Sequence, residues 1–278
     1  MQTLGYYNGE IGELADMKVP MLDRACYFGD GLYEVVYARQ FVPYALSEHI
    51  DRFFKGCGRL GIKPDFTKEK LVDIICSLAR KVDSPYQQIY WQVSRGTGLR
   101  QHIACGNYFP NLWVMIRPQR PRNISDTYKL VSHEDCRHSL CDVKTLNLLP
   151  NILASTYANE RGADECILVR DGVVKECAHS GICYLKGGRL VLPVFGNACL
   201  RGVALDKVRA VATDIGLEVC EEDFGLSCLH NADEVLVCSS GAQCMRVVSI
   251  DGMRVGGKGG EIVEHIQRKI VEDFESLR

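Results

Sequence analysis

Residues 164–194, DECILVRDGVVKECAHSGICYLKGGRLVLPV, decide the fold of the second half of this chain. Two dipeptides, Asp171-Gly172 and Gly187-Gly188, interrupt the apolar runs and favour the tight turns of β-hairpins. The stretch therefore predicts a small β-meander. Glu176 ends one of its strands, where a carboxylate could point into a cleft.

Lys144 lies upstream of the meander, in the stretch CDVKTLNLLPN of residues 141–151. Its neighbours are mostly apolar, and residues 147–163 have the pattern of a helix. Lysine catalysis requires a fixed amine with a lowered pKa, because a mobile ammonium ion cannot attack a carbonyl group. We expect Lys144 to be partly buried. By itself, the pattern also fits a lysine that lays its stem on apolar surface at the end of an element.

Further elements are predicted beyond the meander. Residues 200–216 predict a helix that ends at Gly216, and further strands are predicted over residues 217–224, 234–241 and 245–252.

Two loops in this half could bind a phosphate group. Gly202 directly precedes Val203 and Ala204 at the start of the predicted helix, and Ser239 and Ser240 follow an apolar strand. Helix N-termini and small-residue loops bind anions through backbone N–H groups. Taken singly, either loop also fits an ordinary turn.

The first half of the chain contains both strands and helices. Leu32, Val35 and Tyr37 predict a strand, and a helix is predicted from Ser47. A second helix is predicted over residues 66–82, and two more strands over residues 87–98 and 111–118.

Two pairs of side chains in this half are candidate binding groups. His49 and Arg52 are three residues apart and share one face of the predicted helix. Arg52 could meet a phosphate, or form a surface ion pair with an acid of the same helix. Arg100 and His102 are two residues apart on a glycine-containing loop, so both can point the same way, as binding of a carboxylate requires.

Composition shifts at RPQRPRNIS, residues 117–125, where two prolines and three arginines precede Ile124. We expect an N-terminal α/β domain over residues 1–118, a linker over residues 119–123 and a second domain over residues 124–278.

The bulk composition favours a small-molecule partner. The 278 residues are 46% hydrophobic, and 33 basic residues balance 35 acidic ones, so no net charge attracts nucleic acid or anionic lipid. No apolar run reaches the length of a membrane span, and the first residues lack a signal-peptide pattern, so we expect a cytoplasmic protein. The 14 cysteines show no CxxC spacing, so reduced, apolar thiols are expected instead of disulfides or a metal site.

Taken in order, six stretches resemble the class IV pyridoxal-phosphate aminotransferases, and within them the D-amino acid aminotransferases. They are DRACYFGDGLYEVV (23–36), SEHIDRF (47–53), RGTGLRQH (95–102), CDVKTLNLLPN (141–151), RGADECILVRDGVVKE (161–176) and LRGV (200–203). The resemblance covers essentially the whole chain. It implies an α+β, two-domain type IV fold with a smaller α/β N-terminal domain and a larger C-terminal domain with a β-barrel-like core.

The resemblance also implies a role for each candidate residue. Lys144 would form the Schiff base with pyridoxal 5′-phosphate, and Glu176 would keep the pyridine nitrogen protonated. The remaining cofactor contacts would come from Arg52, Arg137, Leu200, Val203, Ala204, Ser239 and Ser240. The substrate carboxylate would lie among Tyr33, Arg100 and His102, while His49 and His179 would stand around the cofactor. A homodimer is implied, with sites at the domain junction and with Arg100 and His102 donated across it.

The implied reaction is transamination of D-amino acids such as D-alanine with 2-oxo acids such as 2-oxoglutarate, in two half-reactions. Departures from the family pattern occur in ECAHSGIC (176–183), after the glutamate, and at Ala204, where threonine is common. They predict weaker retention of the cofactor than in close relatives.

Alternative functions remain open at this point. Aminodeoxychorismate lyase and the (R)-amine and branched-chain transaminases share the fold and the lysine, but Arg100 and His102 favour an α-carboxylate on the D face. Other classes are a cofactor-binding protein without turnover and a cysteine hydrolase that uses Cys105 near His102 or Cys136 near His138.

Overall fold

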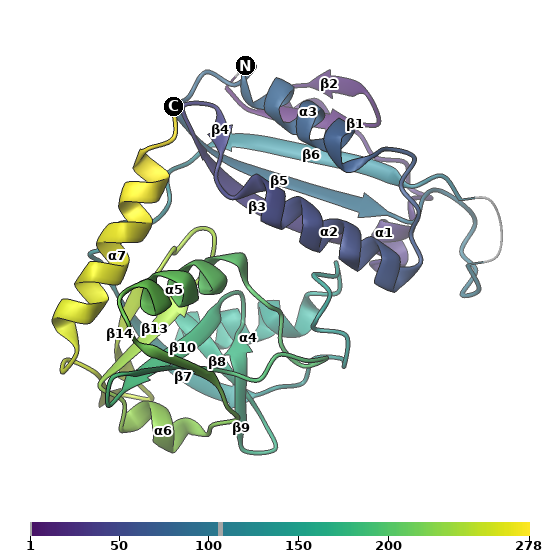
Figure 1. Cartoon of the computed structure of the whole chain (residues 1–278). Coiled ribbons are helices and arrows are strands. Elements are labelled where there is room, and N and C mark those ends of the chain that lie inside the picture. Colours follow the sequence, from purple (N-terminus) through teal and green to yellow (C-terminus); the bar gives the residue numbers. More distant parts are fainter. Residues whose placement is uncertain (1, 105–107) are drawn as a thin grey trace. The chain divides into compact units, whose positions relative to one another are not determined.

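The computed structural model describes residues 2–104 and 108–278 and divides the chain into two compact units (Figure 1). Unit 1 comprises Met1–Arg120, Val143–Asn147 and Ser276–Arg278, and unit 2 comprises Pro121–Asp142 and Leu148–Glu275. The contiguous second domain expected over residues 124–278 differs from this division. The segment around Lys144 and the last three residues belong to unit 1, because backbone pairing with a strand of that unit holds the segment there.

Unit 1 is built on a six-stranded, antiparallel sheet in the order β2-β1-β6-β5-β3-β4. Its strands are β1 (Leu4–Tyr7), β2 (Glu10–Gly12), β3 (Gly31–Arg39), β4 (Val42–Pro43), β5 (Tyr86–Ser94) and β6 (Asn111–Pro118). Its helices are the 3-10 turn η1 (Leu14–Asp16), α1 (Arg24–Phe28), α2 (Leu46–Leu60) and α3 (Lys68–Ala79). The strands and helices predicted for this half are confirmed, and the short elements β1, β2, β4, η1 and α1 are additions.

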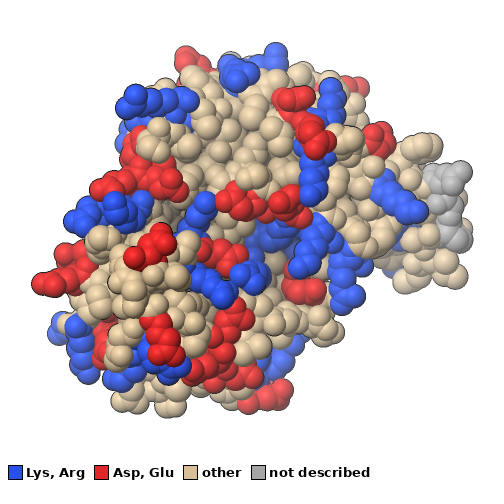
Figure 2. Space-filling view, in the orientation of Figure 1, with Lys and Arg blue, Asp and Glu red and all other residues tan. Residues whose placement is uncertain are grey.

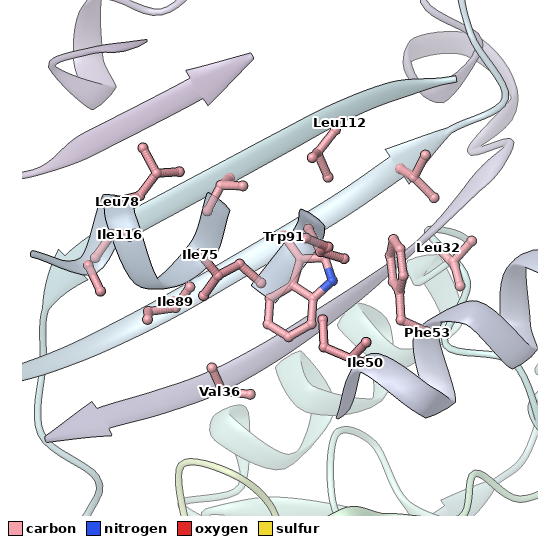
Figure 3. Packing of buried hydrophobic residues seen from close by; sticks show 14 of the residues in the cluster. Leu32, Val36, Ile50, Phe53, Ile75, Leu78, Ile89, Trp91, Leu112 and Ile116 are labelled. Atoms are coloured by element: carbon pink, nitrogen blue, oxygen red, sulfur yellow. The ribbon is translucent and has the colours of Figure 1, made fainter. Parts of the chain in front are cut away.

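The core of unit 1 lies between the sheet and the helices α2 and α3. Trp91 of β5 is fully buried and packs against Phe53 of α2, with ring centroids 6.1 Å apart (Figure 3). Ile75 and Leu78 of α3 lie in the same cluster. Alternation along β3 directs Leu32 and every second residue after it toward this core, so the residues between them, Tyr33 included, face the other way.

Unit 2 contains a nine-stranded mixed sheet in the order β12-β11-β10-β13-β14-β7-β8-β9, with β15 paired to β14. Its strands are β7 (Thr127–Glu134), β8 (Glu165–Arg170), β9 (Val173–Cys177), β10 (Gly181–Lys186), β11 (Arg189–Leu192), β12 (Glu218–Glu221), β13 (Glu234–Cys238), β14 (Met245–Ile250) and β15 (Met253–Arg254). Its helices are α4 (Leu149–Glu160), α5 (Val203–Asp214), α6 (Leu226–His230) and α7 (Gly260–Glu275).

The two hairpins of the predicted meander form at the expected turns, but the meander itself does not, because β9 and β10 are not neighbours in the strand order of the sheet. Asp171 and Gly172, between β8 and β9, both adopt positive φ angles of 53° and 78°. Gly187 and Gly188 do the same between β10 and β11, with φ angles of 57° and 79°. Two successive residues at positive φ make the turn whose twist matches the strands it joins.

Both faces of the unit 2 sheet are buried, which gives the barrel-like core. On β13, Val235 and Val237 lie in the cluster inside the curled sheet, whereas Leu236 lies in the cluster under α5 and α7. The N–H of Cys177 donates to the carbonyl of Ser180, which joins the end of β9 to the start of β10. The sheet therefore curls so that its last strand approaches β10, as the expected barrel-like core requires.

The surface matches the charge balance of the sequence. Basic and acidic side chains are interspersed across the face drawn in Figure 2. Among residues 2–104 and 108–278, no helix combines the length and the apolar composition needed to cross a bilayer. The same residues contain no group of three or more His, Cys, Asp or Glu side chains arranged to hold a metal ion.

Candidate active site

Lys144 is fixed to the first residues of β3. The N–H of Tyr33 donates to the carbonyl of Lys144 at 2.9 Å, and the N–H of Leu146 donates to the carbonyl of Gly31 at 3.1 Å. A Cβ atom at Gly31 would lie 2.8 Å from a methyl group of Leu146 and 2.3 Å from a backbone oxygen, so only glycine permits this approach. The backbone of Lys144 is therefore held as firmly as a strand residue.

The amine of Lys144 lies over the ring of Tyr33, with Nζ 4.3 Å from the ring centroid. Tyr33 in turn stacks on Tyr90 of β5 at 5.4 Å and 22°. Within the described residues of unit 1, Nζ has no hydrogen bond or ion pair. Lys144 is partly buried, as its apolar neighbours predict. The side chain combines a fixed position with an available amine, which a nucleophile or proton carrier requires.

The face of β3 opposite to Tyr33 carries a buried carboxylate, Glu34, which the sequence analysis did not identify. Glu34 is fully buried, and both of its oxygens accept hydrogen bonds from Arg52, at 2.7 and 2.8 Å. His49 Nδ1 lies 2.8 Å from the same carboxylate. His49 and Arg52 do share one face of α2, as predicted, and that face points at the sheet. Arg52 therefore forms a two-pronged ion pair with Glu34 of β3. The contact with a phosphate group stays a prediction.

Burial and charge set the proton affinities in this cluster. Burial alone would raise the pKa of Glu34, but the charge and hydrogen bonds of Arg52 and the hydrogen bond of His49 lower that pKa to about 2. Burial lowers the pKa of His49, and the positive charges of Arg52 and Lys144 add to this effect against the opposing influence of Glu34. Glu34 is therefore anionic and His49 neutral at physiological pH.

Arg100 and His102 lie on the loop between β5 and β6, and both pack on one ring. The guanidinium carbon of Arg100 is 5.0 Å from the centroid of Phe28, and the His102 ring is 5.2 Å from it. Both side chains are exposed. Both side chains point toward the ring of Phe28, and thus the same way, as their spacing predicts. Within the described part of the chain, neither side chain forms a hydrogen bond, an ion pair or a ring contact with Tyr33, the third residue expected to bind the carboxylate.

In unit 2, Glu176 of β9 is paired with Arg137, whose Nη1 donates to Oε1 of the glutamate. The side chain of Glu176 retains 9% exposure, against 5% for Arg137. The N–H of Leu200 points at both oxygens of Glu176, at 3.4 Å each. The structure thus gathers three of the predicted cofactor-binding residues.

Arg137 has a second acidic partner, Asp135, which the sequence analysis also did not identify. Arg137 donates to Asp135 through Nε at 2.9 Å and through Nη2 at 3.0 Å, and Arg170 donates to it at 2.9 Å. Burial alone would raise the pKa of Asp135, but the two arginines bring that pKa below its usual value. Two arginines and two carboxylates therefore alternate, and Glu176 stands at one end of the row.

The two small-residue loops expected to bind phosphate are both next to one apolar cluster of unit 2. Helix α5 begins at Val203 without a side-chain cap, so its first amides, Ala204 included, are left open. Leu205 of the same turn lies in one apolar cluster with Cys238, the residue before Ser239. Ser239 accepts a hydrogen bond from the N–H of Ala242, while the hydroxyl of Ser240 has no partner among the described residues of unit 2.

His179 occupies the turn between β9 and β10 and pairs with another buried acid. Its Nδ1 lies 3.2 Å from Glu165, which also accepts hydrogen bonds from the His179 N–H and the Ser180 hydroxyl. Burial raises the pKa of Glu165. The imidazole of His179 is 56% exposed, so it stands at the surface of the unit, three residues beyond Glu176.

The hydrolase alternative names two cysteines, of which Cys136 lies within the described residues. Cys105 lies outside the described residues. Cys136 is exposed, and Nδ1 of His138 accepts a hydrogen bond from the N–H of Leu140.

The comparisons with known proteins agree on one family. The family model described as Amino-transferase class IV matches residues 31–250. A D-alanine aminotransferase of Listeria monocytogenes serotype 4b (strain F2365) is 34% identical over 275 residues, with 96% of this chain and 94% of the relative covered. A D-alanine aminotransferase of Staphylococcus haemolyticus is 32% identical over 278 residues, and 99% of each chain is covered.

Solved structures of similar fold include branched-chain amino acid aminotransferases. The enzyme from Escherichia coli superposes with a TM-score of 0.89 at 22% identity, and the match covers 99% of this chain and 95% of the enzyme's own chain. The enzyme from the thermophilic archaeon Thermoproteus uzoniensis, solved with norvaline, has a TM-score of 0.88 at 19% identity, with 99% of this chain and 96% of its own covered.

Proposed function

Because this chain belongs to the class IV aminotransferases, we propose that it transfers the amino group of D-amino acids, such as D-alanine, to 2-oxo acids, such as 2-oxoglutarate. The single observation that carries the proposal is the anchoring of Lys144 on β3, with its amine available over Tyr33. The D-alanine aminotransferases at 32–34% identity over nearly the whole chain support the choice of substrate.

The residues present fit pyridoxal 5′-phosphate as the cofactor. The phosphate would take the open amides of Val203 and Ala204 at the start of α5 and the hydroxyl of Ser240, while Glu176 would meet the ring nitrogen. Arg52, Arg137, Leu200 and Ser239 are the further residues that we assign to cofactor binding. When bound, the cofactor supplies an electron-withdrawing ring that stabilises negative charge at the substrate Cα.

The chain's own residues would then position the reactants and move one proton. Lys144 would hold the cofactor before the substrate arrives, and its released Nζ would take the proton from Cα and return it on the cofactor side. Glu176, steadied by Arg137, would keep a proton at the ring nitrogen. Arg100, His102 and Tyr33 would bind the α-carboxylate, and His49 and His179 would tune the surroundings.

The test is spectroscopic and enzymatic. The purified protein should be yellow, and Lys144→Ala should lose the wild-type visible absorption and lower the rate of amino transfer by roughly a thousandfold or more. Assays with D-alanine or L-alanine and 2-oxoglutarate should yield pyruvate and D-glutamate from the D isomer only. An unchanged chromophore in Lys144→Ala would refute the assignment of the lysine. Activity with L-alanine alone would refute D specificity and favour the branched-chain alternative.

The homodimer and the cytoplasmic location inferred from the sequence stay predictions. Aminodeoxychorismate lyase, the nearest alternative, would release pyruvate from its own substrate without producing D-glutamate, so the same assay separates the two reactions.

A further inference from the structure

The segment DRACYFGDG, residues 23–31, contains helix α1, to which the proposed function assigns no role. Three contacts tie this helix, together with Leu22 just before it, to the loop that follows β5. The N–H of Arg24 donates to the carbonyl of Gly96 at 2.9 Å, and the N–H of Gly98 donates to the carbonyl of Leu22 at 3.0 Å. The hydroxyl of Tyr27 also donates to the carbonyl of Gly98. Hydrogen bonds thus hold the first residues of the loop against α1.

The side chain of Arg24 holds the next part of the loop. Only 3% of Arg24 is exposed, and its Nη1 donates to the carbonyl of Gln101 at 2.9 Å. Gln101 is the residue between Arg100 and His102. The guanidinium carbon of Arg24 lies 4.8 Å from the centroid of Phe28 and 5.1 Å from that of Tyr108. The arginine is therefore enclosed by aromatic rings and directed at one carbonyl of the loop.

Arg24 is itself oriented by an acid. Its Nε donates to Asp30 at 2.7 Å, and Arg95 donates to the same carboxylate at 2.9 and 3.1 Å. Arg95 also donates to the carbonyl of Leu60, in the last turn of α2. Asp30 therefore links α1, the base of the loop and the end of α2, which makes the position of Arg24 rigid.

Phe28, at the end of α1, supports the two side chains on either side of Gln101. Arg100 lies 5.0 Å and His102 lies 5.2 Å from its ring centroid. Three successive residues are thus held from α1, the middle one through its backbone and the outer two through their side chains. An exposed loop gains order from such contacts only if they offset the entropy lost on fixing it.

We propose that Arg24 and Phe28 are positioning residues for the substrate carboxylate, since they hold Arg100, Gln101 and His102 as one preordered element on α1. This inference rests on the proposed function, in which Arg100 and His102 bind the α-carboxylate. Neither positioning residue needs to touch the substrate. They lower KM because a preordered site does not have to fix its own side chains when the ligand arrives.

Two variants test the proposal by kinetics. Arg24→Lys keeps the charge beside Asp30 but loses the planar donor, and it should raise KM for D-alanine about tenfold, as expected for loss of a hydrogen bond from a charged group. Phe28→Leu removes the ring and should raise KM roughly threefold. In both variants kcat should change less than twofold. Cys26→Ser alters an exposed side chain of the same helix and serves as the matched control.

A second readout does not depend on activity. Trypsin cleaves after Arg100 when the loop is released, so the rate of cleavage at this bond, mapped by mass spectrometry, should rise about tenfold in Arg24→Lys and remain at the wild-type value in Cys26→Ser. In an Arg100→Ala background, Phe28→Leu should raise KM much less than it does in the wild type, because the carboxylate-binding arginine that the ring supports is gone.

The outcomes separate the inference from the function. Unchanged cleavage after Arg100 in both variants would overturn the inference. So would faster cleavage with an unchanged KM, because the held segment would then not bind the carboxylate. If the wild type transfers no amino group from D-alanine, the proposed function fails. The cleavage rates would still decide whether Arg24 and Phe28 hold the segment.

Discussion

Each unit of the molecule contains a buried cluster of arginine and carboxylate side chains, and the two clusters are built differently. In unit 1, one carboxylate, Glu34, lies between His49 and Arg52, and its side chain is 1% exposed. In unit 2, Arg137 lies between two carboxylates, and the outer one, Glu176, is 9% exposed. The first arrangement encloses its acid between a sheet and a helix, whereas the second leaves its acid at the end of a row.

The difference suggests how to tell a structural acid from a functional one. An enclosed carboxylate that pairs with an arginine inside the unit is needed to fold it, because removing the carboxylate takes away the counter-charge that it provides. A carboxylate at the end of an alternating row can be replaced with less disturbance, because Asp135 still balances Arg137. Glu34 should therefore affect stability most, and Glu176 should affect activity most.

The largest expected effect is on the stability of unit 1. Glu34→Ala removes the carboxylate that pairs with the half-buried Arg52 and the buried His49, so the free energy of unfolding should fall by about 3–5 kcal/mol. Urea denaturation followed by tryptophan fluorescence would measure the change, since Trp91 lies in the same core. Glu264→Ala, on the exposed surface of α7, should change stability by no more than about 0.5 kcal/mol. A loss below about 1 kcal/mol in Glu34→Ala would contradict the structural role.

The pH dependence of stability should come next in size. The pKa of Glu34 is about 2 in the folded chain, whereas a glutamate in the unfolded chain has its ordinary pKa of 4.5. Between these two pH values the unfolded state therefore binds more protons than the folded state. The contribution of Glu34 is therefore fully present above pH 4.5 and is lost as the pH falls toward 2, with a total of about 3 kcal/mol. His49 acts in the same direction below its ordinary pKa, because the folded chain disfavours its protonated form.

Urea unfolding between about pH 7 and pH 3 checks this prediction. The wild type should lose stability steeply below pH 4.5, whereas Glu34→Gln, which cannot titrate at this position, should start lower and lose less. Parallel slopes for the two proteins would show that Glu34 does not cause the acid sensitivity.

The two clusters also show what the sequence could and could not predict. The hairpins of unit 2 were predictable because Asp171-Gly172 and Gly187-Gly188 carry their turn chemistry within two residues. The helix face shared by His49 and Arg52 was likewise predictable from spacing. Helices α1 and α6 have five residues each, too few for a 3.6-residue period to become visible.

Glu34 and Asp135, the acids that pair with Arg52 and Arg137, could not be found from such local patterns. Glu34 and Arg52 are 18 positions apart, and their pairing depends on how α2 packs on β3. The anchoring of Lys144 on β3 joins residues more than a hundred positions apart through backbone atoms, whose hydrogen bonds carry no signature in side-chain identity. Sequence patterns indicate which residues share a face, but tertiary packing decides which face meets which.

A third test addresses Glu176. Glu176→Gln keeps the shape of the side chain but removes its charge, and kcat/KM for D-alanine should fall about a hundredfold, the size of a lost electrostatic contact in an active site. Stability should fall by only about 1 kcal/mol, because Arg137 retains Asp135 and the carbonyl of Ala198. Glu134→Gln, at the exposed end of β7, is the matched control. A stability loss equal to that of Glu34→Ala would remove the distinction between the two acids.

The smallest effect is expected from Asp135→Asn, which acts on Glu176 only through Arg137. Without the charge of Asp135, Arg137 interacts more strongly with Glu176, and in the proposed function that carboxylate would then hold a proton at the cofactor ring less tightly. We expect kcat to fall roughly tenfold and the pH-dependent visible absorption of the bound cofactor to shift toward lower pH. Arg170→Ala removes the partly exposed outer arginine and should change kcat less than about threefold, since Arg137 still neutralises Asp135. An Asp135→Asn protein with wild-type absorption and kcat would show that Arg137 holds Glu176 unaided, and that the alternation of charges in unit 2 serves folding alone.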